Sequence, residues 1–239
     1  MNVVTRDENA PEPTEGPRPG RAEGGLGTLP LYRDDGPVSV GLGVLARGHL
    51  PPLPGALAAL AVTAVLLAAG LGEGGDTALS APLLVPPAVL LLAGPAAGRP
   101  HRGRFDWLVP PVIRAIEYGY LAALGFAQGV TAPLVYVLIA ILAYHHYDIV
   151  YRTRQGFRPP DRVVRAGLGW DGRMLIVALA GLTGHLPFAY AALAVYLGVL
   201  FVTESAATWM RGGHAGGRAG ARGAGRGDGD IGDLEEEKA

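Results

Sequence analysis

The stretch 107-WLVPPVIRAIEYGYLAALGF-126 decides the fold class of this chain. It is apolar over the length of about 20 helical residues that crosses a bilayer core, yet it contains Arg114 and Glu117. A charged side chain at the centre of a bilayer helix costs roughly 2.5–3.5 kcal/mol and usually faces a polar cavity or a partner. At a spacing of three residues the two can also pair and serve helix packing alone. The stretch predicts a membrane helix with a candidate site.

The composition indicates the same class. Of the 239 residues, 49% are hydrophobic and only 17% are charged, whereas soluble domains carry about 25% charged residues. The net charge of −1 says little, because the long apolar stretches hold almost none of the charges. The chain has no cysteine, which excludes a disulfide framework, a thiolate metal site and a cysteine nucleophile.

Apolar segments of membrane length recur along the chain. They cover residues 53–71, 78–97, 107–126, 132–150 and 174–202. The second contains Pro82, Pro86 and Pro87, which we expect to kink it. The last is too long for one ordinary span and has Gly184-His185-Leu186-Pro187 in its middle. It reads as two helices joined by a tight turn, giving six spans, or as one broken or tilted helix, giving five.

Charge placement favours six spans and sets their orientation. In that arrangement the arginine-bearing stretches 99–104, 152–173 and 211–226 fall on one side, whereas the turns 72–76, 127–131 and 184–187 contain no Lys or Arg. Because cytoplasmic loops carry the excess of basic residues, both termini are predicted to be cytoplasmic. Trp107, Trp170 and Trp209 fall at that same interface, which amphipathic rings prefer. The fold class is an all-α, polytopic membrane helical bundle.

The chain divides into three parts. Residues 1–45 are predicted to be a disordered tail, 46–210 the transmembrane domain, and 211–239 a second disordered tail, rich in Gly and Arg and then acidic. Within this scheme the run 38–50 is apolar enough to lie at the membrane surface. The Arg-Gly repeats of the second tail lack interleaved aromatics, so we expect no nucleic acid partner.

The candidate site gathers charges that fall in the cytoplasmic half of the bilayer. His145, Asp148 and Arg152 are spaced i, i+3 and i+7 and share one helix face, whereas His146 points about 100° away from His145. The predicted ligand-binding residues are Arg114, Glu117, His145, Asp148, Arg152, Asp171 and Arg173.

Each of these residues also has an ordinary structural explanation. A histidine at a helix end can act as a partner of the helix dipole. Asp148 and Arg152 can form a simple i, i+4 pair, and Asp171 can cap the helix that it begins. Their convergence on an intramembrane Arg/Glu pair favours a shared pocket.

The chemistry of this pocket suits a phosphorylated or otherwise anionic ligand, because guanidinium groups pair bidentately with phosphate. Glu117, Asp148 and Asp171 are the candidate ligands for Mg²⁺, although their spacing matches no recognised metal motif. No P-loop, Gly-x-Ser-x-Gly, His-Glu-x-x-His or dinucleotide-binding motif is found.

Two motifs carry a resemblance. They are Phe105-Asp106-Trp107-Leu108-Val109-Pro110-Pro111 through Arg114, Glu117, Tyr118 and Tyr120, and His145-His146-Tyr147-Asp148 through Tyr151, Arg152 and Gly169-Trp170-Asp171-Gly172-Arg173. The chain resembles, over residues 40–210, an uncharacterised actinobacterial membrane domain that accompanies CDP-alcohol phosphatidyltransferase-like domains. The resemblance implies a role near phospholipid or phospho-alcohol headgroup metabolism, with such a transferase-like protein as a partner.

The transferase signature itself is missing. That family reads Asp-x-x-Asp-Gly-x-x-Ala-Arg and then Gly-x-x-x-Asp-x-x-x-Asp, whereas only Asp171-Gly172 matches here. Leu175 and Ile176 stand where Ala and Arg are needed, so catalysis by this chain alone is not expected.

The leading hypothesis is a multi-pass protein of the bacterial inner membrane, in contact with membrane lipids, whose cytoplasm-facing pocket serves headgroup metabolism as an accessory. The alternatives are a small proton-coupled transporter or flippase, in which Glu117 and His145 relay protons, and a purely structural membrane subunit.

Overall fold

The computed structural model describes residues 29–47, 50–72, 81–97, 99, 103–155 and 160–224. The described residues form helices and contain no β-strand, which confirms the all-α class. The α-helices are α1 (Leu29–Arg33), α2 (Pro37–Leu45), α3 (Pro52–Gly72), α4 (Val85–Ala93), α5 (Val109–Ala127), α6 (Ala132–Arg154), α7 (Asp161–Ala166), α8 (Gly169–Leu182) and α9 (Leu186–Ala224). Short 3₁₀ helices cover Ala81–Leu84, Gly94–Ala96 and Asp106–Leu108.

Prolines begin these helices. α2, α4, α5 and α6 each have proline at the first or second helical position, where the missing N–H has no helical partner to lose. In the segment that was expected to kink, Pro82 lies in a 3₁₀ turn and Pro86 and Pro87 lie in the first turn of α4. These prolines therefore fall where the 3₁₀ turn passes into α4, inside the continuous helical run Ala81–Ala96.

The long apolar stretch near the C-terminus consists of two helices. α8 ends at Leu182, and the chain reverses through Gly184, whose φ of +73° is costly for other residues. The His185 amide donates to the Ala180 carbonyl at 2.8 Å and the Gly184 amide donates to Gly181 at 3.4 Å, which is a Schellman motif. The same motif ends α5, where Gly129 has a φ of +74° and the Val130 amide donates to Gly125 at 2.9 Å.

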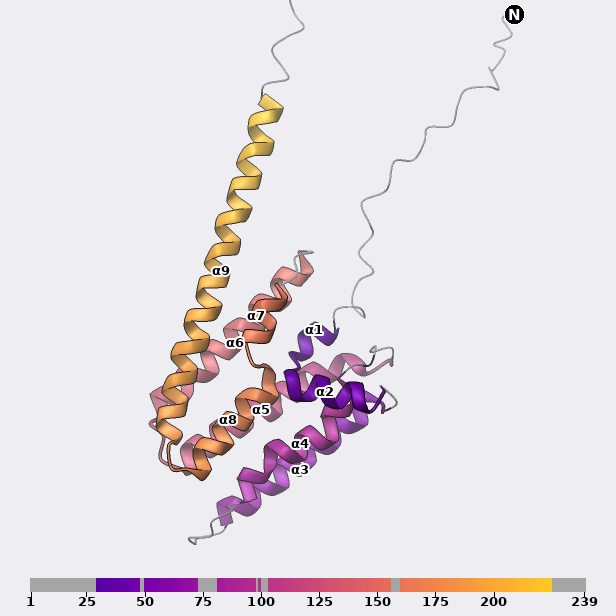
Figure 1. Ribbon diagram of the computed structural model, residues 1–239, viewed down its shortest axis with the longest axis vertical. Helices are drawn as coiled ribbons and strands as arrows, with labels where there is room; N and C mark the ends of the chain where they lie inside the picture. The colour runs from indigo at the N-terminus through magenta and orange to yellow at the C-terminus, as the bar shows by residue number, and fades with distance from the viewer. Residues whose placement is uncertain are drawn as a thin grey trace, which may run out of the picture.

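The helices pack around one hydrophobic core. α3 packs on α4 and α5, α6 packs on α9 and α5, and α8 packs on α5 and α9. Fully buried side chains from four of these helices meet there, among them Ile113, Leu142, Trp170 and Leu197. In Figure 1 the α8–α9 turn and the end of α3 lie at the lower end, while α1 and the end of α9 lie toward the upper end.

Three of the described helices are long and apolar enough to cross a membrane: Pro52–Gly70, Ala132–Arg154 and Leu186–Thr208. Many of their large side chains point outward, including Val65, Tyr136, Val195 and Val199. An outward apolar surface on long helices is compatible with a membrane protein.

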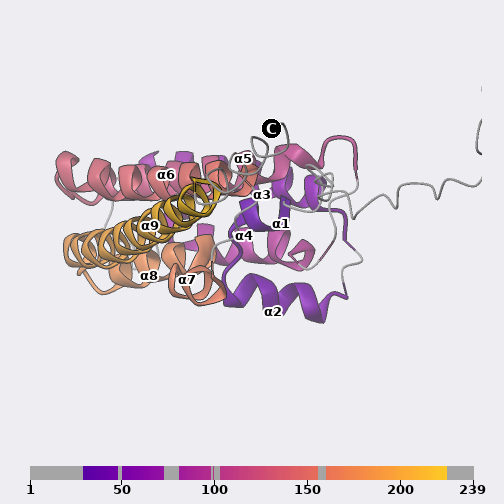
Figure 2. The ribbon, with the colours of Figure 1, turned by 90° about the horizontal axis from the view of Figure 1, so that it is seen from above.

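The N-terminal segment differs from its prediction. Residues 29–45, assigned to a disordered tail, form α1 and α2. α1 contacts α5 and α6, whereas α2 contacts α4, α8 and the 3₁₀ turn Gly94–Ala96. Figure 2 shows α2 at the edge of the bundle. This segment is ordered because polar contacts at residues 32–39, described below, compensate for its small number of large apolar side chains.

The structure describes the two predicted terminal tails only in part. The α9 backbone continues through Ala224, into the stretch assigned to the second tail. Residues 1–28 and 225–239 lie outside the described residues.

Candidate functional site

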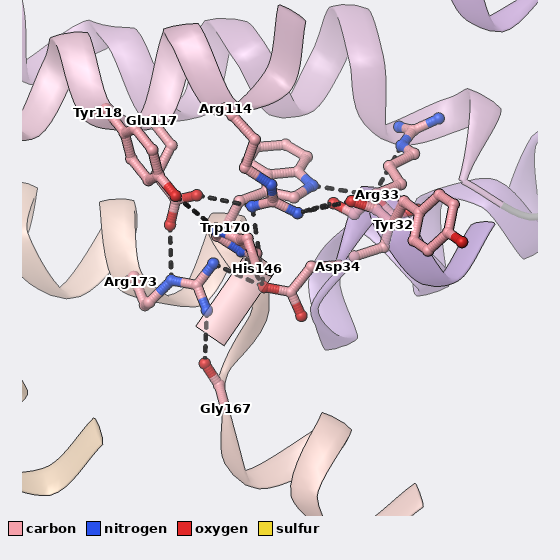
Figure 3. Close-up of polar contacts among 11 residues, drawn as sticks. Tyr32, Arg33, Asp34, Arg114, Glu117, Tyr118, His146, Gly167, Trp170 and Arg173 are labelled. Carbon is pink, nitrogen blue, oxygen red and sulfur yellow. Dashed lines mark hydrogen bonds and ion pairs between the residues drawn. The ribbon is translucent and has the colours of Figure 1, made fainter. Parts of the chain in front are cut away.

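A cluster of buried charges lies where four segments meet. Its members are Asp34 after α1, Arg114 and Glu117 on α5, His146 on α6 and Arg173 on α8 (Figure 3). We call this group the central cluster. Glu117, Asp34 and Arg173 are at most 3% exposed, so each charge needs partners within the protein.

Arg173 is held on several sides. Its Nε donates to Glu117 Oε1 at 2.6 Å, its Nη2 donates to Asp34 Oδ2 at 2.8 Å, and its Nη1 donates to the Gly167 carbonyl at 2.8 Å. Hydrogen bonds between ionised groups are the strong ones, and a planar guanidinium fixes their geometry. Arg173 therefore ties α8 to α5 and to the N-terminal segment.

Arg114 joins the same carboxylate to the end of α1. Its Nη1 donates to Glu117 Oε2 at 2.7 Å, as the spacing of three residues predicted. Its Nη2 donates to the carbonyls of Tyr32 and Arg33 at 3.1 and 2.7 Å. A cation at the C-terminus of a helix also meets the negative end of the helix dipole. Both oxygens of Glu117 thus accept from arginine, and Arg114 holds α1 in place.

Asp34 is the cluster residue that the sequence analysis missed. It follows α1 with a φ of +53°, a left-handed conformation that Asp tolerates better than most residues. Besides Arg173, its Oδ2 contacts His146 Nε2 at 3.2 Å and Arg114 Nη1 at 3.8 Å. Burial alone would raise the pKa of Asp34, but Arg173, the hydrogen bond from His146 and Arg114 together hold that pKa well below its ordinary value.

His146, and not the predicted His145, is the histidine of α6 that belongs to the central cluster. His146 contacts Asp34, and its Nδ1 shares a 2.5 Å hydrogen bond with the Tyr118 hydroxyl. Because a carboxylate only accepts, Nε2 carries a proton and donates to Asp34. His145, the predicted site residue, instead stacks on Phe201 of α9 with ring centroids 3.6 Å apart. The face of α6 that was expected to line the site packs on α9.

Asp148 and Arg152 lie with His145 on the α9 side. They form the i, i+4 pair at 2.7 Å, and Arg152 also contacts Glu204 at 3.7 Å and donates to Thr208 at 3.1 Å. These contacts share no residue with the central cluster. The structure therefore separates six of the seven predicted site residues into two groups, with Arg114, Glu117 and Arg173 in one and His145, Asp148 and Arg152 in the other.

Asp171 caps a different helix from the one expected. Its Oδ2 accepts from the Ser39 amide at 2.7 Å, in the first turn of α2. This contact satisfies one of the amides that a helix leaves free at its N-terminus. The backbones come close because Gly36 faces Gly169, where an added Cβ would lie 2.2 Å from the Gly36 nitrogen.

Trp170 and Asp35 complete this junction. Trp170 was expected at the membrane interface, but it is fully buried and its Nε1 donates to Asp35 Oδ1 at 2.9 Å. Asp35 also accepts from Arg33 Nε at 2.8 Å. Burial raises the pKa of Asp35 above its ordinary value, although Arg33 and the bond from Trp170 oppose the rise. Of the other tryptophans, Trp107 is 58% exposed, and the Trp209 side chain lies outside the described residues.

The three candidate Mg²⁺ ligands do not come together. Glu117 accepts from arginines, Asp148 pairs with Arg152, and Asp171 caps α2. Within the described ranges, no group of three or more His, Asp or Glu side chains is arranged to hold a metal ion.

A groove of about 410 Å³ lies next to the central cluster, between α5 and α6. Its polar members are Tyr32, Arg114, His146 and Arg154, and its remaining lining residues are Trp107, Pro110, Pro111, Ile149 and Val150. Arg114 and His146 belong to both the cluster and the groove. Arg154 is exposed, and it forms no ion pair within the described part of the chain.

The fold and this site define a class: an all-helical protein with three helices of membrane-spanning length and a buried ion-pair cluster. The chain belongs to DUF5941, a family of unknown function, whose match covers residues 22–224. No curated protein and no solved structure matches the chain. The family match begins before α1, so it includes the segment that carries Asp34.

Proposed function

We propose that this chain is a multi-pass protein of the bacterial inner membrane with six spans and both termini in the cytoplasm. Each of the five apolar segments of the sequence contains helix within its described residues, and the stretch 174–202 is broken at Gly184, which gives six candidate spans. The turns at one end lack Lys and Arg, which favours this orientation. A membrane-impermeant maleimide should label Thr183→Cys, but not Gln155→Cys, from outside the cell. Labelling of both positions from one side would contradict the topology.

Its function, in this proposal, is to bind an anionic phosphorylated headgroup at the cytoplasmic surface. The groove between α5 and α6 carries the proposal, because it places Arg114 and Arg154 beside an apolar wall of Pro110, Ile149 and Val150. Guanidinium groups pair with phosphate, and the apolar wall suits the hydrocarbon chain of a lipid.

The biological setting is an accessory role in phospholipid or phospho-alcohol headgroup metabolism. The resemblance to a domain that accompanies CDP-alcohol phosphatidyltransferase-like domains supports this setting. The chain lacks the aspartates of that chemistry, so a transferase-like partner would perform the reaction. The chain would present or retain the headgroup.

The test should spare the central cluster. Glu117→Gln would leave arginines without their buried carboxylate, so a loss of function would not separate binding from folding. Arg154→Gln removes a groove charge that takes part in no described ion pair. Arg165→Gln is the matched control, because Arg165 is exposed on α7 and does not line the groove.

The measurement is native mass spectrometry of the purified protein with added phosphatidic acid or diacylglycerol. We expect the wild type and Arg165→Gln to retain phosphatidic acid, and Arg154→Gln to lose at least about tenfold in affinity, since a charged hydrogen bond contributes about 1.5–3 kcal/mol. Equal retention of diacylglycerol, which lacks the phosphate, would contradict the proposal. So would unchanged binding by Arg154→Gln.

A structural role is the second candidate, because the central cluster joins α1, α5, α6 and α8. Proton transport receives less support. Glu117 accepts only from arginines among its described contacts, and the described ring contacts of His145 are with Phe201 and His146.

A further inference from the structure

α2 has its apolar side chains on the outside. In this nine-residue helix the buried positions are Ser39 and Gly43, whereas Val38, Val40, Val44 and Leu45 are exposed. Val44 is 72% exposed and Leu45 is 80% exposed. A helix on the surface of a water-soluble protein shows the opposite arrangement, with its apolar stripe toward the core.

The inner face of α2 is fixed by protein contacts. The buried Asp171 carboxylate accepts from the Ser39 amide, and Leu42 packs beside Gly94 in the adjoining 3₁₀ turn. No residue of α2 is charged, and its one hydroxyl side chain, Ser39, is buried. The outer face therefore has no polar group with which to hold water.

The position of α2 indicates what covers this face. α2 lies on the outside of the bundle in Figure 2 and runs across the direction of α9 in Figure 1. On α4 and α8, which it contacts, the exposed large hydrophobic side chains include Leu91, Ile176 and Leu179. The helices that α2 contacts thus also have exposed apolar side chains.

We propose that α2 is a membrane-embedded interfacial helix whose outer face contacts lipid acyl chains at the cytoplasmic boundary of the bilayer. Arg47 follows the helix and is exposed, so its guanidinium can reach anionic headgroups while Val44 and Leu45 enter the hydrocarbon. Lipid on the outer face of α2 and Asp171 on its inner face then fix the position of α2. The bend at residues 33–36, which contains Asp34, is held in place as a result. This surface contains no residue of the headgroup groove, and its place at the cytoplasmic boundary rests on the proposed topology.

The absence of cysteine from the chain makes a site-specific probe straightforward. Val40→Cys and Val44→Cys each receive a nitroxide label, and the full-length protein is reconstituted in vesicles of phosphatidylethanolamine and phosphatidylglycerol. Power-saturation EPR compares collisions of the label with oxygen, which concentrates in hydrocarbon, and with a water-soluble nickel chelate. Arg104→Cys is the control, because Arg104 is exposed in the loop before α5.

We expect both α2 labels to collide several-fold more often with oxygen than with the nickel chelate, and the Arg104→Cys label to show the reverse. Nickel collisions at Val44→Cys equal to those of the control would mean that α2 faces water, and would overturn the proposal. Protection from both reagents would also overturn it, because another protein or a second copy would then cover α2. Circular dichroism of each labelled variant verifies that the helices are intact.

Discussion

Asp34 supplies a negative charge that the central cluster requires. Without it Arg173 would keep Glu117 and a carbonyl as partners but would lose one of its two carboxylates, in a place with almost no access to water. The cost of removing one partner from a buried ion pair comes mainly from the charge left behind. Asp34 is therefore expected to matter for stability more than exposed acids do.

Asp34→Asn should lower the free energy of unfolding by about 3–5 kcal/mol, since it leaves buried positive charge uncompensated. Asp148→Asn is the comparison, because Asp148 is more exposed than Asp34 and its partner Arg152 keeps a contact with Glu204, so we expect a smaller loss than at Asp34. Unfolding in mixed detergent and SDS micelles, followed by tryptophan fluorescence, measures both. Equal effects of the two substitutions would show that Asp34 is not a central partner.

The low pKa of Asp34 also predicts how this difference depends on pH. A carboxyl whose pKa is depressed by folding adds stability above its unfolded pKa of about 3.9, and this stability is lost as the pH falls toward the folded value. The gap between wild type and Asp34→Asn should stay constant from pH 7 to about pH 4.5 and shrink below about pH 4. The same titration at a series of pH values tests this. A gap that shrinks already between pH 7 and 5 would indicate another titrating group.

At the scale of helices, the sequence predicted element boundaries better than helix rotations. The apolar segments predicted at 107–126 and 132–150 overlap α5 and α6, and the stretch Gly184-His185-Leu186-Pro187 correctly indicated the break before α9, because these signals act on the local backbone. Which of His145 and His146 faces α5 depends on how α6 packs against α9, and no local signal contains that information.

The N-terminal segment shows the same limit. Gly36-Pro37 is a recognisable helix start, and the adjacent Asp34-Asp35 pair indicates that polar contacts are needed there. Their partners, Arg173 and Trp170, are more than 130 residues away in the chain. The composition of residues 1–45 predicted a disordered tail because these residues include few large apolar side chains. Composition contains no information about contacts with residues so distant in the sequence.

Gly184 offers a test of the α8–α9 turn. Gly184→Ala should lower stability by about 1 kcal/mol, since alanine is strained at a φ of +73° although no neighbouring atom would clash. Gly119→Ala is the control within α5, where an added Cβ also meets nothing and alanine should raise stability by about 0.5–1 kcal/mol. The same unfolding assay distinguishes them, and a destabilisation of equal size at both sites would argue against the turn.

At the scale of the whole molecule, the cluster and the groove divide the roles that the sequence analysis had given to one pocket. The buried charges of Asp34, Glu117 and Arg173 satisfy one another, so they fix the helices. The anionic ligand of the proposal belongs in the neighbouring groove, where Arg114 and Arg154 stand beside an apolar wall.

The most direct test of the account is the place at which an anionic lipid contacts the protein. Phosphatidic acid with a photoreactive diazirine near its glycerol backbone is incorporated into vesicles with the full-length protein and activated by light, and the adducts are mapped by peptide mass spectrometry. The account predicts adducts within residues 107–114 and 146–154, reduced by excess unlabelled phosphatidic acid and by Arg154→Gln. Adducts spread evenly over the outward faces of α3, α6 and α9, insensitive to both, would contradict a specific headgroup site.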